Sequence, residues 1–244
     1  MSEESATAFF DTWQTYRKVV AANYMYHMEI KADIERLLRA QFAGRRFSLL
    51  DLGCGDAATL APLLTSMTVQ HYKGVDLSET ALALAAENLK SLSCPVELAR
   101  RDILAALETD TGRYDVVYTS FALHHLSTEQ KAAFFRLVAQ RLDKDGLLLL
   151  TDVMREDDES LPVYLGRYCD RIHRDWSVLD AEEKASICDH IQNNDRPETF
   201  AELQALGEAA GLAEAAAVAR YGWHRVLWFQ RGAEKTSPDH MPIR

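Results

Sequence analysis

The residues best suited to chemistry follow a short apolar run near position 50. Residues 47–50 predict a buried strand, Asp51 stands at its end, and Gly53 and Gly55 follow with G-x-G spacing. A helical pattern over 57–64 comes next, so a strand, a tight turn and a helix start are expected. Glycines allow the chain to turn sharply and a ligand to approach the backbone. The N–H groups of such a turn can hold a polar ligand.

Two ligand classes fit this turn. Gly53, Gly55 and Ala58 satisfy the dinucleotide fingerprint G-x-G-x-x-G/A, with Asp76 placed to bind a ribose. The competing interpretation depends on Asp51, whose carboxylate would repel a pyrophosphate but attract the sulfonium and ammonium groups of S-adenosylmethionine. The acid therefore favours the methyl donor, although a bare G-x-G also occurs in ordinary turns.

Composition and charge narrow the class of protein. The 244 residues, 48% hydrophobic and 26% charged, suit one α/β domain with additions. A net charge of −10 and a pI of about 5.3 disfavour a nucleic-acid partner, because phosphate binding uses clustered Lys and Arg. The four cysteines lack C-x-x-C spacing, and neither a signal peptide nor a membrane-spanning run is evident. We expect a cytoplasmic protein with free thiols and no membrane partner.

Strands and helices alternate after the first turn, which predicts a parallel sheet with helices on both faces. Ser78 is expected to cap a helix over 79–91, and Ser127 with Gln130 forms a capping box for a helix ending near Leu142. After the first strand, further strands are expected at 71–77, 96–101, 114–120 and 147–153.

Helical segments flank and interrupt this alternation. Residues 7–40 carry apolar side chains at three-or-four spacing with a break near 21–23. Thr199 and Glu202 cap a later helix, and two β-leaning runs around Gly222 predict an antiparallel hairpin. The expected organisation is an N-terminal helical cover (1–45), a core (46–231) with a helical insertion (155–197), and a polar tail (232–244).

The sequence Asp51-Leu52-Gly53-Cys54-Gly55 resembles motif I of the class I S-adenosylmethionine-dependent methyltransferases, with Ala57 at the usual third glycine. The acid ending the second strand, Arg-Asp-Ile after the third and Leu-His-His-Leu after the fourth match the layout of that family over about 47–231. The resemblance implies a doubly wound, mostly parallel seven-stranded sheet with an antiparallel C-terminal hairpin. It also implies S-adenosylmethionine as cofactor, bound by Asp51, Gly53, Gly55, Asp76, Leu77, Asp102, Ile103 and Ser120.

The predicted donor contacts have structural alternatives. The two oxygens of Asp76 could accept hydrogen bonds from a ribose diol, or the residue could serve only as an acid at a helix N-terminus. Asp102 could accept from the adenine amino group while Ile103 packs on the ring, or it could be a solvated loop acid. Ser120-Phe121-Ala122-Leu123 stands where an Asn-Pro-Pro-Tyr motif would be, which weakens amide or adenine N-methylation.

In the family that this sequence resembles, the segments that differ most between members usually form the acceptor pocket. The resemblance therefore implies that the cover (1–45) and the insertion (155–197) form it here. Tyr24 and Tyr26 combine an apolar body with a polar tip, which suits an acceptor or a sulfonium. Arg167 and Arg171 suggest an anionic group on the acceptor, unless they lie on a solvated helix face. The expected substrate-binding residues are Tyr24, Tyr26, Arg167 and Arg171.

Methyl transfer from a sulfonium is an in-line displacement that a dry, closed site favours. It needs at most one base, and none for a thiolate acceptor. The candidates are His125, His124 and His27, whose ordinary pKa lies near neutrality. We expect no metal site, because the paired histidines have no companion at ligand spacing.

The sequence therefore predicts an S-adenosylmethionine-dependent methyltransferase acting on a small-molecule acceptor, with a homodimer left open as its oligomeric state. Three alternatives stay open. They are an NAD(P)-dependent oxidoreductase on the same sheet, a non-catalytic relative that binds S-adenosylmethionine, and donor chemistry other than methyl transfer.

Overall fold

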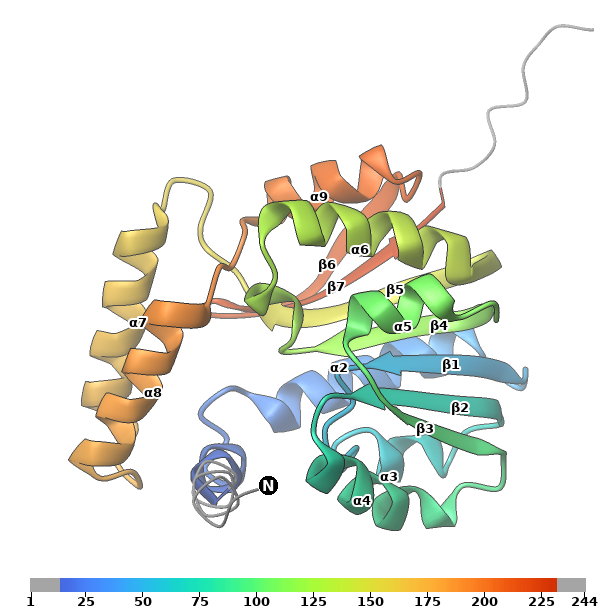
Figure 1. The fold of residues 1–244 in the computed structure, drawn as a ribbon, viewed down its shortest axis with the longest axis horizontal. Coiled ribbons are helices and arrows are strands. Elements are labelled where there is room, and N and C mark those ends of the chain that lie inside the picture. Colours follow the sequence, from blue (N-terminus) through green and yellow to red (C-terminus); the bar gives the residue numbers. More distant parts are fainter. Residues whose placement is uncertain (1–13, 232–244) are drawn as a thin grey trace, which may run out of the picture.

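Short apolar runs pair into one sheet in the computed structural model, which describes residues 14–231 (Figure 1). The sheet order is β3-β2-β1-β4-β5-β7-β6. The first five strands in this order are parallel, and β7 pairs antiparallel with both β5 and β6. The predicted fold class is confirmed. The strands are β1 (Phe47–Leu52), β2 (Val69–Asp76), β3 (Val96–Arg100), β4 (Tyr114–Ser120), β5 (Leu142–Val153), β6 (Glu214–Tyr221) and β7 (His224–Gln230).

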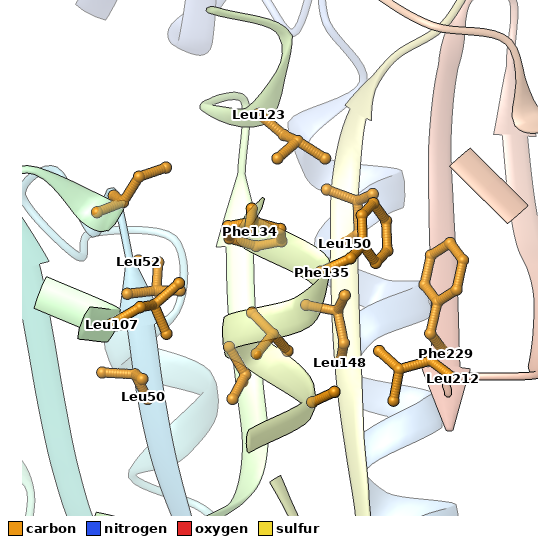
Figure 2. Close-up of a cluster of buried hydrophobic side chains, with 14 of the residues drawn as sticks. Leu50, Leu52, Leu107, Leu123, Phe134, Phe135, Leu148, Leu150, Leu212 and Phe229 are labelled. Atoms are coloured by element: carbon orange, nitrogen blue, oxygen red, sulfur yellow. The ribbon is translucent and has the colours of Figure 1, made fainter. Parts of the chain in front are cut away.

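Helices cover both faces of the sheet because successive strand residues point to opposite sides. Leu49 packs in a cluster with α2, α3 and α4, whereas Leu50 packs in a second cluster with α5, α6 and α9. Figure 2 shows part of the second cluster, including Phe134, Phe135 and Phe229. The helices are α2 (His27–Gln41), α3 (Ala61–Leu64), α4 (Glu79–Asn88), α5 (Ile103–Thr109), α6 (Thr128–Arg141) and α9 (Phe200–Ala209).

A third, smaller cluster lies beyond the carboxyl ends of the parallel strands. It joins α7 (Leu161–Asp175) and α8 (Ala181–Asn194), which lie side by side in Figure 1, to Val19 and Val153. Val19 belongs to a helix whose described part spans 14–21 and which a turn separates from α2, near the predicted break. No strand lies within the insertion, as predicted. The first 13 residues of the predicted cover and the predicted polar tail lie outside the described residues.

The helix starts follow their capping residues. Ser127 with Gln130 and Thr199 with Glu202 form capping boxes, and the Ser78 hydroxyl accepts from the Ala81 N–H. These hydrogen bonds satisfy N–H groups that the first turn of a helix leaves unpaired.

Two boundaries were predicted wrongly. The helix expected over 57–64 is only α3, because Ala57 takes a left-handed φ of 55° that a right-handed helix cannot include. The fifth strand begins at Leu142, whereas the sequence indicates a turn just before 147 and a strand only from 147 onward. Leu142 pairs with Tyr114, and the register shifts before Leu147 pairs with Val116, so the predicted turn is an irregularity within β5.

Two helical glycines give a matched test of how α9 packs against β7. A Cβ on Gly207 in α9 would lie 2.9 Å from Cδ1 of Phe229, whereas a Cβ on the exposed Gly166 in α7 would meet nothing within 4 Å. We expect Gly207→Ala to lower the free energy of unfolding by about 1–3 kcal/mol through overpacking. Gly166→Ala should raise it by about 0.5–1 kcal/mol through helix propensity.

Urea unfolding of both variants against the unaltered protein measures the two differences. A stabilising Gly207→Ala, or equal effects at the two positions, would contradict the packing of α9 against β7.

Candidate functional site

The turn between β1 and α3, here called the elbow (residues 53–58), needs its glycines. Gly53 and Gly55 have φ values of 76° and 54°, in the left-handed region that side chains disfavour. A Cβ on Gly53 would also lie 2.9 Å from Cβ of Ala122, two residues after the end of β4. The elbow can therefore lie close against the neighbouring strand end.

The first three N–H groups of the elbow are not free to hold a ligand, contrary to the prediction. Those of Gly53 and Cys54 both donate to the carbonyl of Val75, at 2.8 and 3.0 Å. The Gly55 N–H donates to Oδ2 of Asp76 at 2.9 Å. These donors are already used, and α3 begins only at residue 61. A pyrophosphate normally binds free N–H groups at a helix N-terminus, so this geometry counts against a dinucleotide.

Asp51 is the most buried acid at the elbow. Its side chain accepts a 2.7 Å hydrogen bond from the Tyr72 hydroxyl, and the residue is only 2% exposed. Burial raises the pKa of Asp51 to about 7, with a further upward contribution from Asp76 and an opposing one from the Tyr72 hydrogen bond. A buried carboxylate held in this way is suited to a cationic ligand, which would favour its charged form.

A cavity of about 230 Å³, here called the donor cavity, opens beside the elbow. It brings together several residues that the sequence predicts for the site: Asp51, Gly53, Gly55, Ser120 and His27. Sequence reasoning missed Tyr118, whose inward direction follows only from its register in β4, and Tyr16, which reaches the cavity from helix 14–21.

Asp76 lies next to this cavity and does not line it. Its Oδ2 braces the Gly55 N–H, and its Oδ1 accepts from the Ser78 N–H at 2.8 Å. Asp76 therefore has the structural role that the sequence offered as its alternative, an acid at the N-terminus of a helix. Each carboxylate oxygen can accept two hydrogen bonds, so Asp76 retains acceptor capacity toward a diol.

The other residues predicted around the adenosine also lie outside the donor cavity. Leu77 is 65% exposed directly after β2. Asp102 caps α5, with Oδ1 accepting from the N–H groups of Leu104 and Ala105. Ile103 is 9% exposed and belongs to the core cluster with α5, α6 and α9. Capping, rather than free solvation, is thus the structural role of Asp102.

A larger cavity of about 910 Å³, here called the acceptor cavity, lies between helix 14–21, α7 and α8. Its walls are mostly apolar and aromatic, with His124, His125 and Asp195 among the polar members. Two residues line both cavities, Tyr16 and Phe121. Phe121 has a φ of 51°, an unfavourable value for a bulky residue, at the point where the cavities meet.

The three candidate bases have different environments. His27 is 8% exposed and lines the donor cavity, and its Nε2 is buried without a hydrogen bond in the described structure. Burial lowers the pKa of His27 to about 4, so its imidazole is neutral and a weak base. His125 lines the acceptor cavity with a side chain 42% exposed.

His124 lies between two carboxylates. Its Nδ1 lies 2.5 Å from Oδ1 of Asp152, and its Nε2 lies 3.7 Å from Oδ1 of Asp195. Burial alone would lower the pKa of His124, but Asp152 and Asp195 raise it above the usual value. Sequence reasoning missed both acids. Asp152 lies near the end of a strand, as Asp51 and Asp76 do, which is a signal that the sequence offers, whereas Asp195 has no such local signal.

The four predicted substrate-binding residues line neither described cavity. Arg167 pairs with Glu159 at 2.7 Å, and Arg171 donates to the Tyr26 hydroxyl and the Tyr24 carbonyl at 3.2 Å. Tyr24 stacks on Trp176, which itself lines the acceptor cavity. The arginines therefore attach α7 to its neighbours, and their positions give no support to an anionic acceptor.

Comparison with known proteins agrees with this geometry. Residues 49–146 match the methyltransferase domain family. The carboxy-S-adenosyl-L-methionine synthase of Aeromonas salmonicida is 26% identical over 206 residues, covering 80% of this chain and 74% of that protein. The enzyme of the same name from Pseudomonas aeruginosa is 28% identical over 186 residues, with 72% and 73% covered.

Solved structures show the same fold. Magnesium protoporphyrin IX methyltransferase from Synechocystis PCC 6803, with bound SAH, has a TM-score of 0.62 at 17% identity, covering 92% of this chain and 94% of that one. A cyclopropane synthase from Mycobacterium tuberculosis has a TM-score of 0.53 at 16% identity, with 75% and 76% covered. The chain thus contains a region similar to the methyltransferase domain, is similar in sequence to enzymes named for S-adenosylmethionine, and has the fold of a methyltransferase solved with SAH.

Proposed function

We propose that the protein transfers the methyl group of S-adenosylmethionine to a small molecule held in the acceptor cavity. The observation that carries this proposal is the meeting of the two cavities at Tyr16 and Phe121. A donor sulfonium on one side of these residues would face an acceptor atom on the other. Such an arrangement supports in-line displacement, to which fixed orientation can contribute on the order of 7–11 kcal/mol.

The donor cavity suits one end of S-adenosylmethionine. Its volume of about 230 Å³ is below the roughly 300–1,000 Å³ typical of complete small-ligand sites. We therefore place the methionyl part there, with its ammonium toward Asp51. The adenosine would extend outside, toward Asp76, Leu77 and Asp102. Aromatic faces of Tyr16 and Phe121 would then lie near the sulfonium, which they attract.

The lining of the acceptor cavity points to the chemistry of the acceptor. Tyr164, Tyr168 and Trp176 supply aromatic surface, which suits an aromatic or aliphatic body. The cationic side chain that lines it, Lys18, pairs with Glu183 at 2.6 Å. We therefore propose an uncharged or cationic acceptor with an apolar body, in place of the anionic acceptor suggested by the sequence.

Two of the three histidines are placed to act on the acceptor. His125 is exposed to the acceptor cavity, and His124 lies beside it on the same 3₁₀ turn, Leu123–His125. Either could accept a proton from an acceptor hydroxyl or amine as the methyl group arrives. His27 faces the donor instead, and we assign it a role in packing around the methionyl group.

The relatives are named as synthases of carboxy-S-adenosyl-L-methionine, and this name suggests a second chemistry of the donor, its carboxylation. Such a product carries an added carboxylate, which needs a cation beside it when it is buried. Within the described residues the donor cavity is lined by no Lys or Arg, and burial keeps its histidine neutral. We therefore favour methyl transfer.

Three further expectations belong to this proposal. No helix of the described chain is long and apolar enough to cross a membrane, and all four cysteines are free. Free thiols are usual in a reducing compartment, and we propose the cytoplasm. A homodimer stays a prediction, as does the absence of a nucleic-acid partner.

Calorimetry with S-adenosylmethionine, S-adenosylhomocysteine and NADH tests the function. We expect binding of the first two and none of NADH. Incubation with aromatic hydroxyl and amine acceptors should then yield S-adenosylhomocysteine and a methylated product by mass spectrometry. Donor binding without turnover of any acceptor would favour a non-catalytic relative, and a carboxylated donor in the product would favour the chemistry of the named relatives.

Asp51→Asn should stabilise the ligand-free protein while weakening donor binding. The folded pKa of about 7 exceeds the ordinary value of 3.8, so Asp51 destabilises the fold increasingly as pH rises from about 4 to above 7. The variant should therefore gain about 2–4 kcal/mol over the unaltered protein at pH 8 and almost nothing at pH 4. Its affinity for S-adenosylmethionine at pH 8 should fall by about tenfold or more.

Urea unfolding at the two pH values measures the first effect, and calorimetry measures the second. A stability difference that does not change with pH would refute the raised pKa, and unchanged affinity would remove Asp51 from the donor site.

Asp76→Ala should weaken S-adenosylmethionine binding by about 1.5–3 kcal/mol, because it removes hydrogen bonds to the ribose. Since Asp76 also braces the elbow, a control must separate binding from stability. Ser78→Ala removes only the cap of α4 and should lower stability by about 1 kcal/mol while leaving donor affinity unchanged. Equal donor affinity in the two variants, measured by calorimetry, would place the ribose elsewhere.

A further inference from the structure

Three atoms of metal-ligand type converge at one end of the acceptor cavity. They belong to His124 and His125, on the turn after β4, and to Asp195, at the end of the insertion. Oδ1 of Asp195 lies 3.3 Å from Nδ1 of His125 and 3.7 Å from Nε2 of His124. All three atoms lie within 4.8 Å of one another. The sequence predicts no metal site because no third ligand lies near the histidine pair in the chain. The fold brings such a ligand, Asp195, to the pair from 70 positions beyond His125.

The carboxylate of Asp195 is buried and incompletely satisfied. The residue is 5% exposed, and Oδ1 accepts no hydrogen bond in the described structure. Its neighbours on this side are the two imidazoles, which make no hydrogen bond to it and form ion pairs with it only when they are protonated. A buried carboxylate oxygen left in this state is costly, so its persistence points to a cation between it and the imidazoles.

His124 is oriented as metal-binding histidines usually are. Asp152 lies 2.5 Å from Nδ1 and also accepts from the backbone N–H of His124, at 3.0 Å. A carboxylate that holds Nδ1–H leaves the lone pair of Nε2 for a metal and fixes the direction of the ring. Here the ring directs Nε2 toward Asp195, so Asp152 and Asp195 lie on opposite sides of the His124 imidazole.

The segment that carries Asp195 is anchored to the core. The N–H of Arg196 donates to the carbonyl of His124 at 2.7 Å. Two residues later, Glu198 pairs at 3.2 Å with Lys131 of α6, a lysine that is 1% exposed. These contacts fix Asp195 beside the histidines, and a preorganised site needs such support.

We propose that His124, His125 and Asp195 bind a divalent transition-metal ion, with Zn²⁺ as the simplest occupant. Imidazole nitrogens with a carboxylate suit such ions, and three protein ligands leave a position open. Zinc bonds of about 2.0–2.1 Å in a tetrahedron separate ligand atoms by about 3.3–3.4 Å. The two separations from Asp195, 3.3 and 3.7 Å, are close to this value, and the two imidazole atoms, which lie within 4.8 Å of each other, would close around the ion.

The open position would face the acceptor cavity, because all three ligands line it. An oxygen, nitrogen or sulfur atom of the acceptor could bind there and lose its proton to solvent more readily. With the ion bound, His124 and His125 serve as ligands, and the ion takes the place of a histidine base. This role toward the acceptor rests on the proposed function, whereas binding of the ion does not.

Titration of tag-free, EDTA-treated protein with Zn²⁺ by calorimetry, and with Co²⁺ by visible absorption, tests the site. We expect one ion per chain and Co²⁺ bands typical of nitrogen and oxygen ligands. Asp195→Asn and His125→Ala should each weaken binding at least about tenfold, and Asp152→Asn about 10–100-fold. The control His71→Ala changes a histidine of β2 outside the site and should bind as the unaltered protein does.

Substoichiometric binding, or equal affinity in Asp195→Asn, His125→Ala and the unaltered protein, would overturn the proposal and leave an ion pair between His124 and its two acids. His125 is partly exposed, so His125→Ala provides the test if Asp195→Asn does not fold. S-adenosylmethionine affinity of the same variants should be unchanged, because none of the three ligands lines the donor cavity. Metal binding without donor binding would refute the proposed function alone, and donor binding without metal binding would refute this inference alone.

Discussion

The hydrogen bonds that tie the elbow to β2 are the constraint on which the rest of the site depends. Val75 accepts from two elbow N–H groups, and Asp76 accepts from a third. Because these donors are used within the protein, the N–H groups of Gly53, Cys54 and Gly55 are not available to a ligand, and the buried acid Asp51 lies beside them. A cation is favoured beside a buried acid and a phosphate is not. These backbone contacts thus count against a dinucleotide at the elbow.

Acids held by hydrogen bonds recur where parallel strands end. Asp76 is the last residue of β2, and Asp51 and Asp152 are the last residues but one of β1 and β5. Each has a defined hydrogen-bond partner: backbone N–H groups for Asp76, a tyrosine hydroxyl for the buried Asp51 and an imidazole for the buried Asp152. A buried carboxylate is stable only with such partners. The sheet therefore gathers negative charge along one edge, and the helical insertion closes over that edge with Asp195. Donor and acceptor cavities share this edge and differ in which elements cover it.

Most of the fold could be predicted from the sequence, because it rests on local and periodic signals. The strand over 114–120 and the two capping boxes depend on neighbouring residues, and the structure has them as predicted. The predictions that failed depend on backbone conformations that composition does not reveal. Ala57 adopts a left-handed φ that shortens α3, and an irregular pairing extends β5 back to Leu142.

The sequence by itself determined the motif I elbow, the acid beside it, the alternation that builds the sheet and the histidine pair after β4. These are features of contiguous residues, whose types and spacing already carry the physical information. Only the tertiary structure decided that Asp76 braces the elbow, that Arg167 and Arg171 attach α7 to its neighbours, and that Tyr16 and Phe121 separate two cavities. It also brought Asp195 to His124 and His125. Such contacts join residues far apart in the chain, and packing of the insertion against the sheet determines them.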